Sequence, residues 1–292
     1  MNLNSLLIGQ DIDPENVIVM RHRPFETALN KALPWLAADK PDVFNAYQCG
    51  QGAKLEKAMT AMAGTGYVAS FIGRDSGRAL FVGLYQITGA APITKRQYWK
   101  IPANAQLKSL GMKGFTDSRK TILWFDLKPV DFYKSWKGKL LVGWPPPDRS
   151  WWRRAHRNDM QVQAVLEESA LDAEMPAWHD IDLSWEELKV LPKRWQASLE
   201  QWRGIYYIFD VTDDKGYVGS AYGKTNILGR WRNYSVGGHG GNHHLLKRDP
   251  MNFRFSILQR VSPDLDATDV INLEASWKKR LHTQSPHGLN AN

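Results

Sequence analysis

Two tyrosines lie on segments that the sequence predicts to be neighbouring strands in the last third of the chain. Tyr206 ends a Gly-Ile-Tyr run, and Tyr217 begins a Tyr-Val-Gly run. The apolar segment 205–211 and the segment 217–221 are typical of strands, and 212–216 has turn chemistry, so we expect a β-hairpin. The two hydroxyls could then converge, and buried phenols need polar partners. The alternative is a hairpin with ordinary aromatic core residues.

A carboxylate follows on a predicted helix. The pattern from Asp266 to His282 places four apolar residues on one stripe: Val270, Leu273, Trp277 and Leu281. Glu274 falls on the same stripe, where a carboxylate is unfavourable unless it is paired or binds a metal. The alternative is an exposed Glu274–Lys278 pair of small energy. One carboxylate with waters and a substrate phosphate is a common way to hold Mg²⁺.

Between the hairpin and this helix the chain is strongly basic. The segment 224–248 has no acidic residue and five basic ones: Lys224, Arg230, Arg232, Lys247 and Arg248. This excess suits a polyanion, and a guanidinium can hold two phosphate oxygens at once. Arg230 could instead only cap or solvate a short helix.

The stretch 237–244 is rich in glycine and histidine and is predicted to be a loop. His239 and His243 have a spacing that would suit zinc on a helix, but the glycines argue against a helix. We therefore favour a solvated loop, or a DNA-phosphate contact made by His239 and Asn242.

The order of these residues resembles the GIY-YIG nuclease family. That family has a hairpin with two tyrosines, an arginine on the next helix, a glutamate on a later helix and a terminal asparagine, which here is Asn290. The resemblance covers about residues 188–292. Val218 replaces the isoleucine of the second motif, and Tyr234 stands where some members carry histidine.

The resemblance implies a fold and a catalytic set. The fold is a three-stranded antiparallel sheet flanked by helices. The activity is DNA hydrolysis with Mg²⁺ (or Mn²⁺) held by Glu274. Tyr206 would be the general base, Tyr217 would hold the water and phosphate, and Arg230 would stabilise the transition state. Tyr234 and Asn290 complete the expected catalytic residues.

Composition is consistent with a DNA-binding protein. The chain has 292 residues and a formal net charge of +8, and Cys49 is the only cysteine. The charge fits a nucleic-acid partner, and one cysteine excludes an intrachain disulfide and favours a reducing compartment. The sequence has no run of eighteen apolar residues, so we expect no membrane span. The first residues lack the basic and then apolar order of a signal peptide. We expect a cytoplasmic protein.

Charge also predicts the domain organisation. Residues 159–187 contain nine acidic residues and no lysine or arginine, so we interpret 158–187 as an acidic linker, with a helix at 160–171. The alternative for this segment is an autoinhibitory mimic of DNA. A further helix is predicted at 188–203, at the start of a nuclease domain that spans 188–292.

Residues 1–157 form a second α+β domain. Strands are predicted at 67–72, 79–87, 121–126 and 139–144, and helices at 25–37 and 52–63. These elements suggest a small curved sheet or barrel with flanking helices. The hairpin at 67–87 weakly resembles PUA-like domains, which include readers of modified bases.

Two basic and aromatic stretches, 95–120 and 149–157, could contact DNA. The second contains the predicted contact residues Trp151, Trp152, Arg153 and Arg154. Arginine binds phosphate or guanine, and tryptophan stacks on bases; the alternative is that the tryptophans are core residues. A reader of modified bases would flip the base into an aromatic pocket.

Three functions remain open from the sequence. The first is a restriction-type or defence endonuclease that acts on double-stranded DNA, with residues 1–157 as the reader. A homodimer is plausible here, because one site cuts one strand. The second is a repair, recombination or mobile-element nuclease with the same chemistry. The third is a DNA-binding protein whose nuclease site is inactive.

Overall fold

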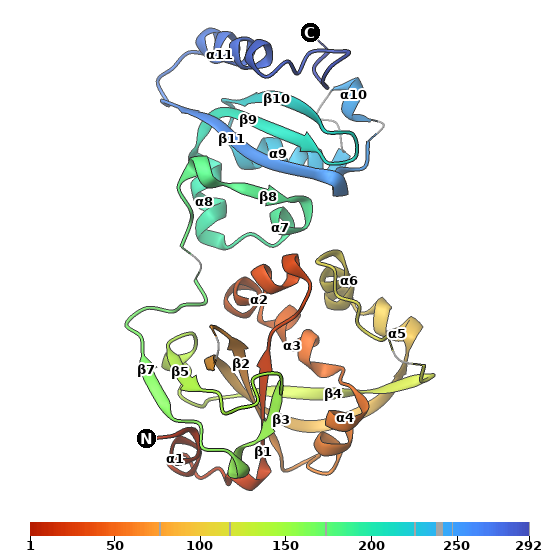
Figure 1. Cartoon of the computed structure of the whole chain (residues 1–292), viewed down its shortest axis with the longest axis vertical. Helices are drawn as coiled ribbons and strands as arrows, with labels where there is room; N and C mark the ends of the chain where they lie inside the picture. Colours follow the sequence, from red (N-terminus) through yellow and green to blue (C-terminus); the bar gives the residue numbers. More distant parts are fainter. Residues whose placement is uncertain are drawn as a thin grey trace. The chain divides into compact units, whose positions relative to one another are not determined.

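The computed structural model describes residues 1–75, 77–116, 118–172, 174–224, 226–237, 242–246 and 248–291 (Figure 1). The chain divides into two compact units, Met1–Ala173 and Glu174–Asn292. Within the described ranges, no helix has both the length and the apolar character needed to cross a membrane.

A curled seven-stranded sheet forms the first unit, in the order β6-β1-β2-β3-β5-β7, with β4 paired to β3 (Figure 1). The strands are β1 (Val17–His22), β2 (Tyr67–Gly73), β3 (Arg78–Thr94), β4 (Thr121–Val130), β5 (Leu140–Gly143), β6 (Trp152–Arg154) and β7 (Val162–Val165). β1 and β2 are parallel, and the other pairs are antiparallel. Strand β3 pairs with β5 at its start and with β4 along its second half. Its register shifts between Ile87 and Gly89, and such bulges bend a sheet. The predicted α+β fold with a curved sheet is confirmed.

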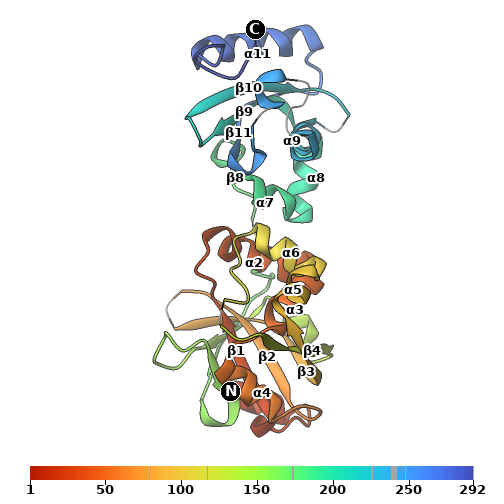
Figure 2. The ribbon, with the colours of Figure 1, turned by 90° about the vertical axis from the view of Figure 1, so that its right-hand side faces the viewer.

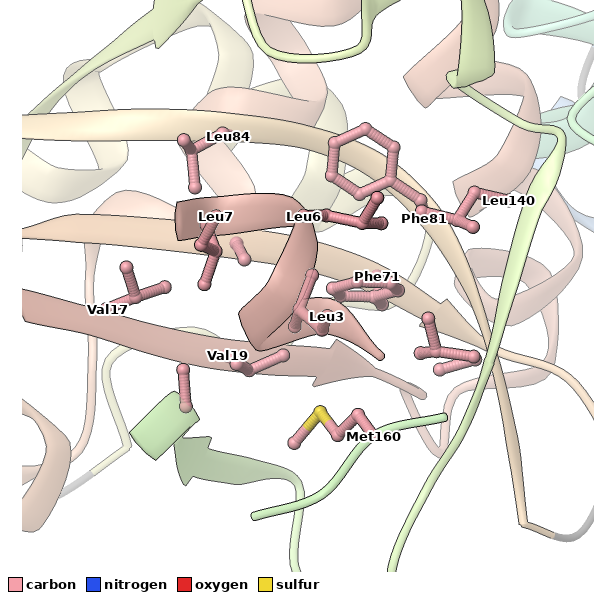
Figure 3. Close-up of a cluster of buried hydrophobic side chains, with 14 of the residues drawn as sticks. Leu3, Leu6, Leu7, Val17, Val19, Phe71, Phe81, Leu84, Leu140 and Met160 are labelled. Atoms are coloured by element: carbon pink, nitrogen blue, oxygen red, sulfur yellow. The ribbon is translucent and has the colours of Figure 1, made fainter. Parts of the chain in front are cut away.

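Helices flank this sheet and supply part of its core. They are α1 (Leu3–Ile8), α2 (Thr27–Asp39), α3 (Pro41–Cys49), α4 (Ala53–Thr60), α5 (Lys95–Lys100) and α6 (Pro102–Ser109). Figure 3 shows three leucines of α1 beside Val17 and Val19 of β1 and two phenylalanines of β2 and β3. These side chains belong to one buried apolar cluster, so the first unit has a hydrophobic core of its own.

The acidic segment 158–187 contributes to both units and is not only a linker. The helix predicted at 160–171 is wrong: Val162–Val165 is strand β7, which pairs with β5 from Leu140↔Val165 to Val142↔Val162. Its burial alternates with a period of two, as on a strand with one open face. The β-branched residues and a partner strand outweigh the helical propensity of the neighbouring residues.

The second unit is built on a four-stranded antiparallel sheet in the order β10-β9-β11-β8. Its strands are β8 (Asp182–Ser184), β9 (Arg203–Asp210), β10 (Lys215–Ala221) and β11 (Phe253–Val261). The predicted hairpin is β9–β10, in register from Gly204↔Ala221 to Asp210↔Lys215. The three strands expected from the resemblance are β10, β9 and β11, and the short β8 extends them at the edge of β11.

Five helices of the described chain accompany this sheet: α7 (Trp185–Lys189), α8 (Lys193–Gln201), α9 (Asn226–Gly237), α10 (His243–Leu246) and α11 (Ala267–Arg280). The structure has two helices where one was predicted at 188–203. Pro192 cannot continue a helix, so α7 ends before it and α8 begins after it. Of the loop predicted at 237–244, Gly237 is the last residue of α9 and His243 is the first of α10, whereas 238–241 lie outside the described residues.

Helix α11 starts as predicted, with the Asp266 side chain accepting a hydrogen bond from the Asp269 amide. Its Val270 packs with Ile205 and Val218 on one face of the sheet. Leu281 lies beyond the helix end and is 39% exposed, so it is not part of the buried stripe. On the other face, Trp231 of α9 packs against Phe255 of β11, with ring centroids 5.6 Å apart. Figure 2 shows α9 and α11 in a second view.

Candidate active site

The hairpin register places both predicted tyrosines on the same face of the sheet. Tyr206 lies opposite Gly219, and Tyr217 lies opposite Ile208, the second residue after Tyr206. Their ring centroids are 6.5 Å apart. A side chain at position 219 would overlap the Tyr206 ring and hydroxyl, so the glycine of the second motif makes room for the tyrosine of the first.

Helix α9 adds a third phenol. The hydroxyl oxygens of Tyr206 and Tyr234 are 2.9 Å apart, and both residues are only 1% exposed. The ring centroid of Tyr217 lies 5.9 Å from that of Tyr234. The hydrogen-bond partner of Tyr206 is therefore Tyr234, and the structure groups all three predicted tyrosines.

Burial raises the pKa of each tyrosine in this group. For Tyr206, burial is the largest cause and the neighbouring Tyr217 raises the pKa further. The hydrogen bond with Tyr234 and the positive charge of Arg230 act in the opposite direction. The phenols are therefore protonated at neutral pH, and a role as a base requires additional positive charge near them.

Arg230 lies near the tyrosines, on the same helix as Tyr234. It lies one turn before Tyr234 on α9, so the two residues share a helix face. It is exposed, and among the described residues it has no ion-pair or hydrogen-bond partner. Arg232 differs, because its guanidinium contacts Gln196 Oε1 at 2.6 Å and Glu200 Oε1 at 3.3 Å.

Glu274 reaches the sheet from α11. Its carboxylate accepts a hydrogen bond from the Ser220 hydroxyl of β10, and its Oε1 lies 2.8 Å from Lys278 Nζ. The Glu274–Lys278 pair considered from the sequence thus exists, but the two side chains are only 17% and 14% exposed. Sequence reasoning missed Ser220. Its signal was a polar residue two positions after Val218, on the face that α11 covers.

A divalent cation at this site has one protein carboxylate available. No group of three histidine, cysteine, aspartate or glutamate side chains that could hold a metal occurs in the part of the chain that the structure describes. Zinc normally takes three or four such ligands. Mg²⁺ keeps several waters and is often held by one or two carboxylates with a substrate phosphate, so Glu274 fits Mg²⁺.

Asn290 positions the edge strand of the hairpin. The Asn290 side-chain amide donates to the Val218 carbonyl at 2.8 Å and accepts from the Val218 amide at 2.9 Å. The Leu289 amide donates to the Gly216 carbonyl at 2.9 Å. These bonds cover the open edge of β10, next to Tyr217. Both polar groups of the Asn290 side chain are used in this way, which gives it a positioning role.

We predict that Asn290→Ala lowers the free energy of unfolding by about 2 kcal/mol, because it leaves a buried donor and acceptor unpaired. The expected loss of melting temperature is roughly 6–12 °C. Thermal unfolding monitored by circular dichroism measures this, with Asn272→Ala on the exposed side of α11 as the control. Equal melting temperatures for the two variants would contradict the role of Asn290.

The remaining predicted DNA contacts of this unit are mostly engaged elsewhere. Arg248 Nη1 lies 2.6 Å from both Asp210 Oδ2 and Asp213 Oδ1. Asn242 donates to the Leu289 carbonyl at 2.8 Å and accepts from the His244 amide. Lys224 is exposed. His239 and Lys247 lie outside the described residues. DNA binding by this set stays a prediction, with Lys224 the described member that remains available.

The four residues of the first unit that we predict to contact DNA differ in their exposure and in their partners. Trp151 is 40% exposed, whereas Trp152 is half-buried on β6. Arg153 donates to the carbonyls of Pro145 and Pro147 at 2.9 and 3.1 Å. Arg154 lies 3.7 Å from the Met62 sulfur. Trp151 is thus the member of the set whose side chain is most open to a ligand.

Known proteins resemble the second unit. Residues 203–288 match the model of the GIY-YIG catalytic domain. A solved structure of the catalytic domain of intron endonuclease I-TevI, in a mutant form, is 24% identical to this chain. The match covers 32% of this chain and 95% of that one, with a TM-score of 0.27. No curated protein matches the chain. Residues 203–288 are a GIY-YIG catalytic domain, which is a nuclease domain; the weak PUA-like resemblance of the first unit stays a prediction.

Proposed function

We propose that the GIY-YIG catalytic domain makes this chain a Mg²⁺-dependent endonuclease of restriction or defence type, acting on double-stranded DNA in the cytoplasm. The observation that supports this most is the cluster of Tyr206, Tyr217 and Tyr234 beside Arg230, whose guanidinium has no partner among the described residues. Protonated phenols together with an available guanidinium suit a phosphodiester and disfavour a cationic or apolar substrate.

Arg230 and Tyr217 would bind the scissile phosphate. The Arg230 guanidinium can contact two phosphate oxygens, where negative charge increases in the transition state. Tyr217 is less buried than Tyr206, and its hydroxyl would hold the attacking water against the phosphorus. The products would be a 5′-phosphate and a 3′-hydroxyl.

Tyr206 would accept the proton of the attacking water, as the family resemblance implies. Burial disfavours the phenolate that this step requires, and Arg230 partly offsets that effect. Glu274 would hold Mg²⁺, assisted by the Ser220 hydroxyl that orients the carboxylate, and Lys278 would then have to give up its contact with Oε1. When bound, Mg²⁺ neutralises charge on the transferred phosphate and the leaving 3′-oxygen.

The first unit would select the DNA target. It is basic and aromatic in sequence, and its described residues include no predicted catalytic group. A homodimer on DNA would supply the second cut that a duplex break needs, because one site cleaves one strand.

We test this function by incubating the full chain with plasmids carrying unmodified, methylated or hydroxymethylated cytosine. We expect nicking in Mg²⁺, none in EDTA, and cut ends that share a motif or modification. A fragment from Glu174 to Asn292, which keeps β8 and α7, should nick without site preference.

Absence of nicking on every substrate would contradict the nuclease assignment. A fragment that cuts at the same sites as the full chain would contradict the role of the first unit. Cuts at branched or damaged positions would indicate a repair enzyme.

A further inference from the structure

The first unit contains a cavity of about 850 Å³ that the proposed chemistry does not use. Strand β1 ends beside it, and its lining also includes residues of α2, α3, α5 and β4 and of the stretches 50–52, 112–116 and 148–151. Aromatic side chains form much of the wall: Tyr47, Tyr98, Phe115 and Trp151. Tyr98 and Phe115 are each 4% exposed, so these two rings are fixed by packing.

Two of the polar groups that line this cavity, His22 and Tyr47, are uncharged at neutral pH. Burial lowers the pKa of His22 to about 4, so its imidazole is neutral at pH 7, and its Nε2 lies 3.3 Å from Gln48 Oε1. Burial raises the pKa of Tyr47, and its ring lies 5.3 Å from that of His22. In the described part of the chain the Tyr47 hydroxyl has no hydrogen-bond partner. A neutral ligand with donors and acceptors can therefore be recognised here.

The lining is cationic overall. Four basic residues (Arg21, Arg23, Lys113 and Arg149) stand against two carboxylates (Glu26 and Asp148). Arg21 Nη1 and Arg23 Nη1 contact Asp148 at 2.6 and 3.3 Å. Lys113 and Arg149 are exposed and, among the described residues, have no ion-pair partner. These two remain available for an anion.

Arg21 adds an unsatisfied donor to the lining. It is 2% exposed, and its Nε has no hydrogen-bond acceptor among the described residues. A buried guanidinium nitrogen without a partner is unfavourable, whereas the Nη atoms of Arg21 are held by Asp148.

We infer that this cavity receives a nucleotide extruded from a DNA strand, with its base against Tyr47 and Trp151 and its phosphates on Lys113 and Arg149. The inference rests on the proposed function only in taking DNA as the partner. Planar bases stack on aromatic rings, and their edges carry neutral donors and acceptors. A cationic rim fits the phosphates on either side of an extruded base. The volume exceeds that of one base and leaves room for the sugar or for a substituent on the base.

The test uses binding and not cleavage. The Glu274→Gln protein is titrated, in EDTA, into two labelled duplexes of the same sequence. One duplex is fully paired, and the other has a single unpaired nucleotide. Fluorescence anisotropy measures the binding. Extrusion of an unpaired nucleotide no longer requires breaking a base pair, so we expect about 10-fold tighter binding to that duplex. Equal affinities would overturn the inference. Because no cut is measured, a failure of the nuclease assignment would leave this readout intact.

Variants locate the preference in the cavity. Trp151→Ala and Tyr47→Ala should reduce it to less than about 2-fold at unchanged melting temperature, whereas Trp178→Ala, in the other unit, should keep it. Lys113→Ala should weaken binding to both duplexes and lower the slope of log K against log[salt] by about one charge. Lys134 lies outside the lining, so Lys134→Ala should have a smaller effect on both the affinity and the slope. A preference that survives in both Trp151→Ala and Tyr47→Ala would overturn the inference. So would tighter binding of free deoxynucleoside monophosphates than of the unpaired duplex.

Discussion

Glu274→Gln is expected to abolish cleavage and to leave DNA binding nearly intact. The substitution keeps the shape of the side chain and an oxygen that can accept from Ser220, but it removes the carboxylate that we propose to hold Mg²⁺. A metal at a phosphoryl site contributes several kcal/mol to the transition state, so the rate of nicking should fall on the order of 10³-fold. Single-turnover nicking and anisotropy with the same DNA measure the two effects separately.

Glu200→Gln is the matched control for this variant. Glu200 is a 49% exposed carboxylate of the same unit, on α8, and it pairs with Arg232. Its loss should change the nicking rate less than about 2-fold, as for other exposed pairs. Cleavage by Glu274→Gln at the wild-type rate in Mg²⁺ would show that Glu274 does not hold the metal.

Arg230→Ala is expected to reduce the single-turnover rate by about 10²–10³-fold, the usual loss when a donor to a transition-state oxyanion is removed. Arg230 lies on the same helix face as Tyr234, and no described residue engages its guanidinium. Arg230→Lys should restore little of the rate, because an ammonium cannot contact two phosphate oxygens in a fixed geometry. Nicking under saturating enzyme measures the rate without the contribution of binding.

Arg232→Ala separates this role from general attraction to DNA. Both arginines are exposed on α9, but Arg232 is bound to Gln196 and Glu200. We expect its loss to weaken binding slightly, in a salt-dependent way, without lowering the saturated rate. If lower salt or more enzyme restored the full rate of Arg230→Ala, Arg230 would contribute only non-specific electrostatic attraction to DNA.

The features that depend on neighbouring residues could be predicted from the sequence. The β9–β10 hairpin follows from β-rich segments around a turn, and the start of α11 follows from the helical apolar pattern that begins at Asp266. These signals lie within a few residues of each other, so they can be recognised without the fold. The curved α+β architecture of the first unit was predicted from the same kind of local pattern.

Which charged and polar groups contact one another depends on long-range packing. Five basic residues between 224 and 248 look alike in sequence, yet Arg248 is bound by Asp210 and Asp213, and no described residue binds Arg230. Those partners lie more than thirty residues away, and no local pattern identifies them. The same holds for β7, which is a strand because β5 pairs with it. The Ser220–Glu274 contact and the Tyr206–Tyr234 hydrogen bond likewise join residues of separate elements, so only the packing of helices on the sheet could bring them together.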